Sequence, residues 1–246
     1  MCIRDRHWFD YLNQKSADTP IKYEQVLSFE HETILDSPKE NVEQFIKRWD
    51  VRFTQPVSII CASRGSLLAK CMAAHPALTD RIPIDRIAIV SGGYSDYFDK
   101  NDGIEAYVKT HALFLPPKAY AFLRALLHVI PKLPGLEVQC KENDSFKAFT
   151  EKENVPLSST KVTYYNMTNK FPFHQGAKID TVAKKFLGDD NDLALSLVAQ
   201  RDFRPGVNHA AFPPFEGKEK HGEGLRLLKP KQLLFDFLTS NLAPVA

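Results

Sequence analysis

Apolar and polar residues are arranged along the chain in blocks that predict helices and strands in alternation. The best-defined helix covers residues 39–49, because its apolar residues recur at the spacing of one helical face. These residues are Val42, Phe45, Ile46 and Trp49. Ser37 followed by Pro38 is typical of a helix start, with the serine as N-cap and the proline in the first turn. We therefore expect an amphipathic helix that packs one face on a core.

Four short runs rich in apolar and β-branched residues predict strands. They cover residues 23–29, 56–61, 84–90 and 161–167. Further helices are predicted over residues 66–74, 181–187 and 227–242, and a loop over residues 204–224. Strands that alternate with helices are typical of a mostly parallel sheet with helices on both faces. We therefore expect an α/β fold in which residues 1–246 form a single domain.

The middle of the chain, about residues 101–151, predicts helices interrupted by prolines. Its segment 107–136 is rich in Leu, Phe, Ala and Pro. Two interpretations stay open for this segment, a helical cap or lid over a site and a plain helical excursion packed on the sheet. In either case its apolar character favours an acyl or other hydrophobic substrate over a sugar or a nucleotide.

Composition excludes several classes of partner. Lys and Arg exceed Asp and Glu by only 32 − 30 = 2, which disfavours electrostatic tracking of nucleic acid. The four cysteines, at positions 2, 61, 71 and 140, form no CxxC pair. No His, Asp and Glu spacing is typical of a metal site, and no Gly-rich loop predicts nucleotide binding. We therefore expect no metal and no cofactor.

No stretch of the chain predicts a stable membrane span or a signal peptide. The most apolar stretch, residues 112–136, is interrupted by charged residues and prolines. The start of the chain is charged and has no apolar h-region, so a cytoplasmic location is the default expectation. The first six residues, MCIRDR, predict no structural element and resemble an adapter-derived start. We therefore expect the natural protein to begin further upstream.

One motif carries chemistry, a serine between a strand and a helix. The sequence CASRG at residues 61–65 follows a β-branched run and precedes a helix of small residues. A nucleophile elbow needs small residues two positions before and after its serine, which here are Cys61 and Gly65 around Ser63. Gly65 fits this pattern, whereas Cys61 replaces the usual glycine. An ordinary β-turn-α junction with a capping serine is the alternative interpretation.

Several motifs occur in an order that points to one family. EHETILDSP spans residues 30–38, EN follows at 40–41, and CASRGS spans 61–66. Over residues 28–74 the chain resembles a lipase-like branch of the α/β-hydrolase superfamily of serine hydrolases. Further along, LPGL at 133–136 resembles that family's cap segment and NDL at 191–193 its acid loop. The resemblance implies an α/β-hydrolase fold with a helical cap and carboxylic ester hydrolysis.

The resemblance also implies a catalytic triad of Ser63, Asp192 and His221. α/β-Hydrolases carry these residues in the order Ser, Asp, His, and here the separations are 192 − 63 = 129 and 221 − 192 = 29 residues. His221 would accept the proton of Ser63, and Asp192 would orient the imidazole. His209 is the rival base because it lies in the same long loop. Asp189 and Asp190 adjoin the proposed acid and are its rivals.

Three further residues are expected beside the site: Arg64, Ala62 and His31. The backbone N–H of Arg64 would be one oxyanion donor, and its side chain could pair with an acidic group. His31 would lie in a loop near the site and hold that loop by hydrogen bonding.

The second oxyanion donor of an α/β-hydrolase normally comes from a His-Gly loop after an early strand. No such loop precedes Tyr23, so we expect that the first strand or strands are missing from this chain. Two other functions stay open. One is another acyl-transfer activity on the same triad, as in a thioesterase, an amidase or an acyltransferase. The other is a non-catalytic binding protein of the same fold, which Cys61 and the missing loop would favour.

Overall fold

The computed structural model describes residues 10–12, 14–15, 27–29, 31, 35–50, 52–92, 117, 162–170, 197, 200, 215–218 and 228–240. The predicted helix over 181–187 lies outside these residues, and so does the helical segment 101–151 except for Pro117. None of the helices within these ranges is long and apolar enough to cross a membrane.

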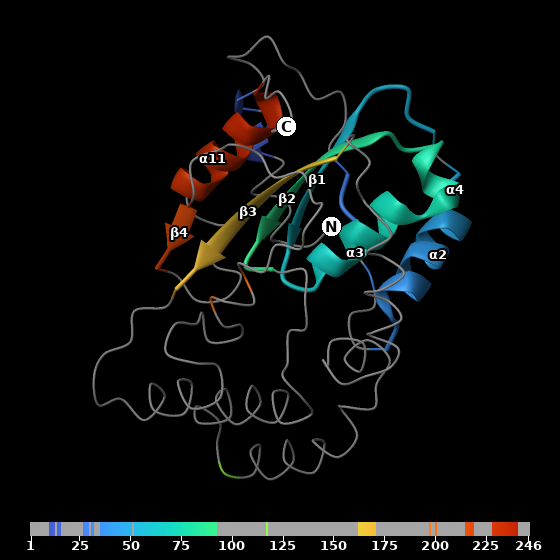
Figure 1. Ribbon diagram of the computed structural model, residues 1–246, viewed down its shortest axis with the longest axis horizontal. Coiled ribbons are helices and arrows are strands. Elements are labelled where there is room, and N and C mark those ends of the chain that lie inside the picture. Colours follow the sequence, from blue (N-terminus) through green and yellow to red (C-terminus); the bar gives the residue numbers. More distant parts are fainter. Residues whose placement is uncertain are drawn as a thin grey trace.

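Four parallel strands form the sheet, in the order β1-β2-β3-β4 (Figure 1). They are β1 (Val57–Ala62), β2 (Ile84–Val90), β3 (Thr163–Asn169) and β4 (Phe215–Gly217). Since the strand order follows the chain order, each strand extends the sheet in the same direction. The parallel α/β class predicted from the sequence is therefore confirmed.

The carboxyl ends of the strands lie at one edge of the sheet. Ala62 and Val90, the last residues of β1 and β2, lie opposite each other, and Asn169 and Gly217, the last residues of β3 and β4, pair two residues further along. In open parallel α/β sheets, ligands bind outside the carboxyl ends of the strands. A ligand-binding site is therefore expected at this edge of the sheet.

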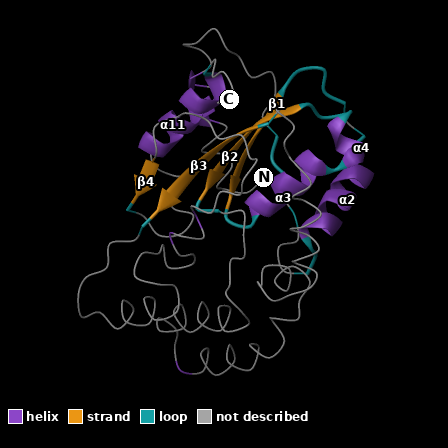
Figure 2. Cartoon of the chain, viewed as in Figure 1, coloured by secondary structure: helices purple, strands orange, loops and turns teal. Residues whose placement is uncertain are grey.

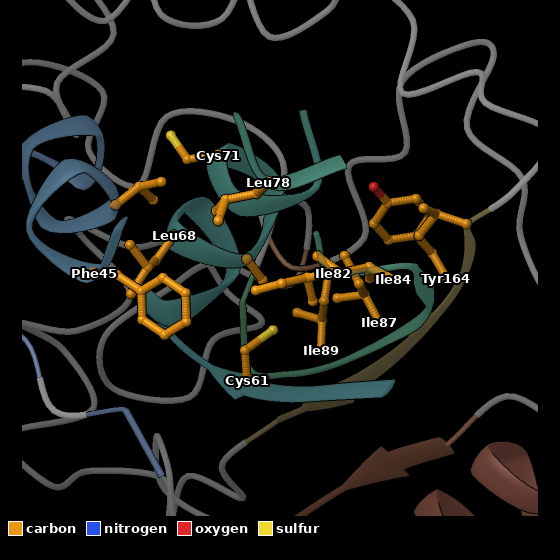
Figure 3. Close-up of a cluster of buried hydrophobic side chains, with 13 residues drawn as sticks. Phe45, Cys61, Leu68, Cys71, Leu78, Ile82, Ile84, Ile87, Ile89 and Tyr164 are labelled. Carbon is orange, nitrogen blue, oxygen red and sulfur yellow. The ribbon is translucent and has the colours of Figure 1, made fainter. Parts of the chain in front are cut away.

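Helices cover both faces of the sheet (Figure 2). The helices α2 (Pro38–Arg48), α3 (Gly65–Ala74) and α4 (Pro76–Thr79) lie on one face, and α11 (Leu228–Thr239) lies on the other. The side chains of β2 alternate accordingly: Ile87 and Ile89 pack toward α2 and α3, as Figure 3 shows, whereas Ala88 and Val90 pack toward α11. This alternation is the two-residue period of a strand that is buried on both faces.

The start of α2 follows the sequence prediction. The Ser37 hydroxyl accepts a hydrogen bond from the Glu40 backbone N–H at 3.2 Å, and the Glu40 carboxylate accepts one from the Ser37 backbone N–H at 2.7 Å. The two bonds form a capping box and hold the pKa of Glu40 below its usual value. Val42 and Phe45 are buried on the predicted apolar face.

Two predictions differ from the structure in the described residues. Residues 27–29, the only described part of the predicted strand 23–29, are not in a strand. Leu27 is 53% exposed, and Phe29 instead stacks edge-on against Phe45 at 5.0 Å between ring centroids. The predicted loop 204–224 contains the strand β4, whose three residues (FEG) are too few for a periodic signal.

Candidate functional site

Ser63 occupies the turn between β1 and α3, at the carboxyl edge of the sheet. Its φ of 51° lies in the left-handed region, which is unfavourable for any residue except glycine. Such conformations persist only where the surrounding structure enforces them, and they cluster at functional sites. Ser63 is also partly exposed. The strand–serine–helix arrangement that the sequence predicts is therefore present, with the strained serine that an elbow requires.

Hydrogen bonds fix the Ser63 backbone on both sides. Its N–H donates to the carbonyl of Val90, in the neighbouring strand, at 3.1 Å. Its carbonyl accepts from the Ser66 backbone N–H at 3.0 Å and from the Ser66 hydroxyl at 2.8 Å. Because Ser66 is fully buried in the first turn of α3, these bonds tie the strained turn to the helix.

The departure of Cys61 from the usual glycine is accommodated. A Cβ atom added to Gly65 would lie 3.5 Å from the Cys61 Cβ, an ordinary van der Waals distance. The Cys61 thiol is buried in the cluster drawn in Figure 3, where it lies 3.4 Å from the Ala88 carbonyl and burial raises its pKa. Cys61 is therefore a core residue that leaves room for the turn.

Gly92 lies directly against this turn from the end of β2. A Cβ atom added to Gly92 would lie 2.9 Å from the Ser63 carbonyl oxygen, 2.9 Å from Ile89 Cγ2 and 3.0 Å from Ser66 Cβ. These distances are shorter than real side chains tolerate. Gly92 is therefore the residue that allows the second strand to approach the serine turn.

Arg64 follows Ser63 and is only 4% exposed. Its guanidinium lies 3.3 Å from His31 Nδ1 and donates a second hydrogen bond to the Asp36 carbonyl. The pKa of His31 is lowered, first by burial and then by the charge of Arg64. The side chain of Arg64 thus connects the serine turn to His31 and to the backbone of Asp36.

A second polar group lies at the same edge, and sequence reasoning missed it. Ser91, with a φ of 48°, follows β2 as Ser63 follows β1. Its hydroxyl accepts a hydrogen bond from the Asn169 side chain, and Gln200 bonds to the Asn169 backbone. All three side chains are fully buried. The Ser91–Gly92 pair after a strand was a usable signal, whereas nothing in the sequence marks Gln200.

The structure brings together Ser63, Arg64 and His31, and it places Ala62 at the end of β1, partly buried against the α11 cluster. The other predicted site residues lie outside the described residues: Asp189, Asp190, Asp192, His209 and His221. Within the described ranges, no cluster of three His, Cys, Asp or Glu side chains could hold a metal ion.

Comparison with known proteins gives one match. The model of a domain of unknown function (DUF7379) matches residues 9–95, which are 95 − 9 + 1 = 87 of the 246 residues. The matched segment contains His31, Ser63, Arg64 and Gly92. No curated protein and no solved structure matches the chain.

Proposed function

We propose that the protein is a serine hydrolase of the α/β-hydrolase fold that cleaves carboxylic esters, with Ser63 as nucleophile, Asp192 as acid and His221 as base. The observation that carries this proposal is the conformation of Ser63. A partly exposed serine with positive φ, between a parallel strand and a helix, is the local structure of a nucleophile elbow. Ser91 has a similar φ, but its full burial makes it unsuited to attack a substrate.

Chain length allows His221 to serve as the base. His221 follows the end of β4 by 221 − 217 = 4 residues, which span at most about 14 Å. Three strand spacings separate β4 from β1, about 14 Å in total, so this reach suits a contact with Ser63. His209 precedes β4 by 215 − 209 = 6 residues, and Phe215 is level with Ala62 across the sheet, so chain length also allows His209. We prefer His221 because it lies in the loop just before the last helix.

The position of Asp192 in the chain also agrees with this assignment. It falls after β3 and before β4, so the order Ser, Asp, His follows the order of strands β1, β3 and β4 along one edge. Gln200, which is hydrogen-bonded to Asn169 at the end of β3, follows Asp192 by 200 − 192 = 8 residues. A short segment therefore separates the proposed acid from a residue fixed at this edge.

The proposed reaction is acyl transfer in two steps. His221 accepts the Ser63 hydroxyl proton as Oγ attacks the ester carbonyl carbon, and Asp192 stabilises the imidazolium. The carbon–oxygen bond to the alcohol then breaks, and His221 returns the proton to the leaving alkoxide. Water attacks the acyl-enzyme in the same way, releasing the carboxylic acid and regenerating Ser63. The backbone N–H of Arg64, at the start of α3, would stabilise the oxyanion.

The apolar residues of segment 107–136 favour an ester with a hydrophobic acyl group as substrate. A series of p-nitrophenyl esters of increasing acyl length tests this part of the proposal. Because the triad serves several acyl-transfer reactions, the same series should include a thioester and an amide.

The direct test is labelling with a fluorophosphonate probe, read by intact mass. We expect one adduct on the wild-type protein and none on Ser63→Ala. The matched control is Ser58→Ala, on the same strand, whose hydroxyl bonds to Asp85 away from the turn. It should label as the wild type does. A folded wild-type protein that takes no adduct, or an adduct that survives in Ser63→Ala, would contradict the proposal.

A further inference from the structure

Three fully buried polar side chains, Ser91, Asn169 and Gln200, meet at the carboxyl ends of β2 and β3. Burial of polar groups costs free energy unless hydrogen bonds compensate it. A buried polar network whose members are hydrogen-bonded to one another makes the surrounding structure more rigid. The hydrogen bonds of this group show which geometry it fixes.

Gln200 pairs with Asn169 as a neighbouring strand would. The Asn169 backbone N–H donates to Gln200 Oε1 at 2.8 Å, and Gln200 Nε2 donates to the Asn169 carbonyl at 2.9 Å. The carbonyl of Gln200 also accepts a hydrogen bond from the Asn166 side chain. One side-chain amide thus holds the last residue of β3 through both of its backbone groups.

Asn169 in turn connects β3 to the end of β2 by hydrogen bonding. Its side-chain amide donates to the Ser91 hydroxyl, and the Ser91 backbone N–H donates to the Met167 carbonyl at 3.0 Å. Gly92, the next residue, lies so close to Ser63 that a Cβ atom there would be 2.9 Å from the Ser63 carbonyl oxygen. A continuous series of contacts therefore runs from Gln200 to the backbone of the serine turn.

We propose that Gln200 is a positioning residue for Ser63, acting through Asn169 and the Ser91–Gly92 turn; this inference rests on the proposed hydrolase function. The strained φ of Ser63 requires support from its surroundings, and β2 provides it through the 3.1 Å hydrogen bond from the Ser63 N–H to the carbonyl of Val90, the residue before Ser91. Gln200 follows the proposed acid, Asp192, by 200 − 192 = 8 residues along the chain. Gln200 touches no substrate in this role.

The test is the Gln200→Ala variant, compared with wild type in ester hydrolysis and fluorophosphonate labelling. Misplacement of catalytic groups by about 1 Å costs up to about 100-fold in rate. We expect kcat and the labelling rate to fall about 10- to 100-fold with KM changed by less than about 3-fold.

The pH profile separates positioning from a general loss of stability. A carboxylate beside the base raises its pKa, so displacement of Asp192 should move the acidic limb of kcat/KM to lower pH by about one unit or more. The matched control is Gln232→Ala, which removes another bridging glutamine, bonded to Tyr11 and Asp236 on the α11 face. It should leave both kcat and the acidic limb unchanged.

A second variant keeps the test decisive if Gln200→Ala does not fold. Ser91→Gly removes the hydroxyl that accepts from Asn169, and glycine adopts the φ of 48° without strain. We expect it to fold and to lower kcat in the same direction. If both variants fold and keep the kcat and the acidic limb of the wild type, the positioning role of Gln200 is overturned. The hydrolase proposal would survive that result, because the wild-type enzyme would still be labelled at Ser63. A wild-type protein that does not label would overturn the hydrolase function, and this inference with it.

Discussion

Arg64 donates a hydrogen bond to His31 Nδ1 at 3.3 Å, although 33 positions separate the two residues in the chain. A guanidinium has no acceptor, so Nδ1 must be the acceptor in this pair. His31 is therefore neutral, with its proton on Nε2. The residue that follows Ser63 thus fixes the tautomer of a histidine in the preceding loop, and its charge helps to keep that histidine neutral.

We expect Arg64→Ala to lower the free energy of unfolding by about 2–3 kcal/mol. The substitution removes the charged donor from His31 Nδ1 and from the Asp36 carbonyl. The melting temperature should fall by roughly 5–10 °C for a chain of this size. Arg48→Ala, at the exposed end of α2, is the control and should change stability by less than about 0.5 kcal/mol. Equal melting temperatures for the two variants would contradict the bridging role of Arg64.

The lowered pKa of His31 predicts a pH dependence of stability. Because burial and Arg64 depress the pKa in the folded state, the unfolded chain binds the proton more readily. The stability that neutral His31 contributes is therefore complete above about pH 6.5, the pKa of histidine in the unfolded chain. It is lost as the pH falls toward the lower pKa of His31 in the folded protein. His31→Gln keeps an acceptor for Arg64 but does not titrate. In urea unfolding from pH 7.5 to pH 5, wild type should lose stability relative to this variant, and parallel curves would refute the prediction.

Glycine substitutions beside the serine turn should differ sharply. Gly92→Ala should destabilise the protein by about 1–3 kcal/mol and slow fluorophosphonate labelling, since its Cβ would meet the Ser63 carbonyl oxygen at 2.9 Å. A Cβ atom at position 65 would meet only the Cys61 Cβ, at the ordinary distance of 3.5 Å. Gly65→Ala should therefore be tolerated or slightly stabilising, because alanine reduces the entropy of the unfolded chain. Urea midpoints and labelling rates measured side by side check both. Equal effects would show that the approach of Gly92 does not constrain the turn.

Cys61→Ala tests whether the cysteine takes part in catalysis or only fills the core. We expect a loss of about 1 kcal/mol, because the buried sulfur contacts the cluster between the sheet and α3, and an unchanged labelling rate at Ser63. Cys71→Ala, a buried cysteine on α3, should give a similar loss and serves as the comparison. Labelling that disappears in Cys61→Ala alone would assign a catalytic role to the thiol.

The elements with strong local signals were predictable from the sequence. Strand 84–90 coincides with β2, and the helix over 39–49 begins at the predicted cap, Ser37. In both, local preference and burial agree, because the apolar period matches the face that packs on the core. The helix predicted over 227–242 contains α11, in which Leu234 and Phe237 are buried.

What the sequence could not predict depends on contacts between distant segments. The apolar run that ends at Phe29 predicts a strand, but residues 27–29 are not in a strand. The side chain of Phe29 instead packs edge-on against Phe45, which is distant in the chain. The hydrogen bond from Asn169 to Ser91 spans 78 positions, and no local pattern marks either residue for the other. At the candidate site, the serine turn was predictable from its place between a strand and a helix and from the small residues around it. Of its buried polar neighbours, Ser91 carried a signal in the sequence, whereas Gln200 did not.

The order of the strands has a consequence for folding. The pairing of Ala62 with Val90 closes 90 − 62 = 28 residues, whereas that of Val90 with Met167 closes 167 − 90 = 77. The longer closure costs about 0.9 kcal/mol more in chain entropy. We therefore expect β1, α3 and β2 to associate early, and β3 to join them later. A chain that has lost only its β2–β3 pairing would keep the serine turn and lose the amide of Gln200 that supports it.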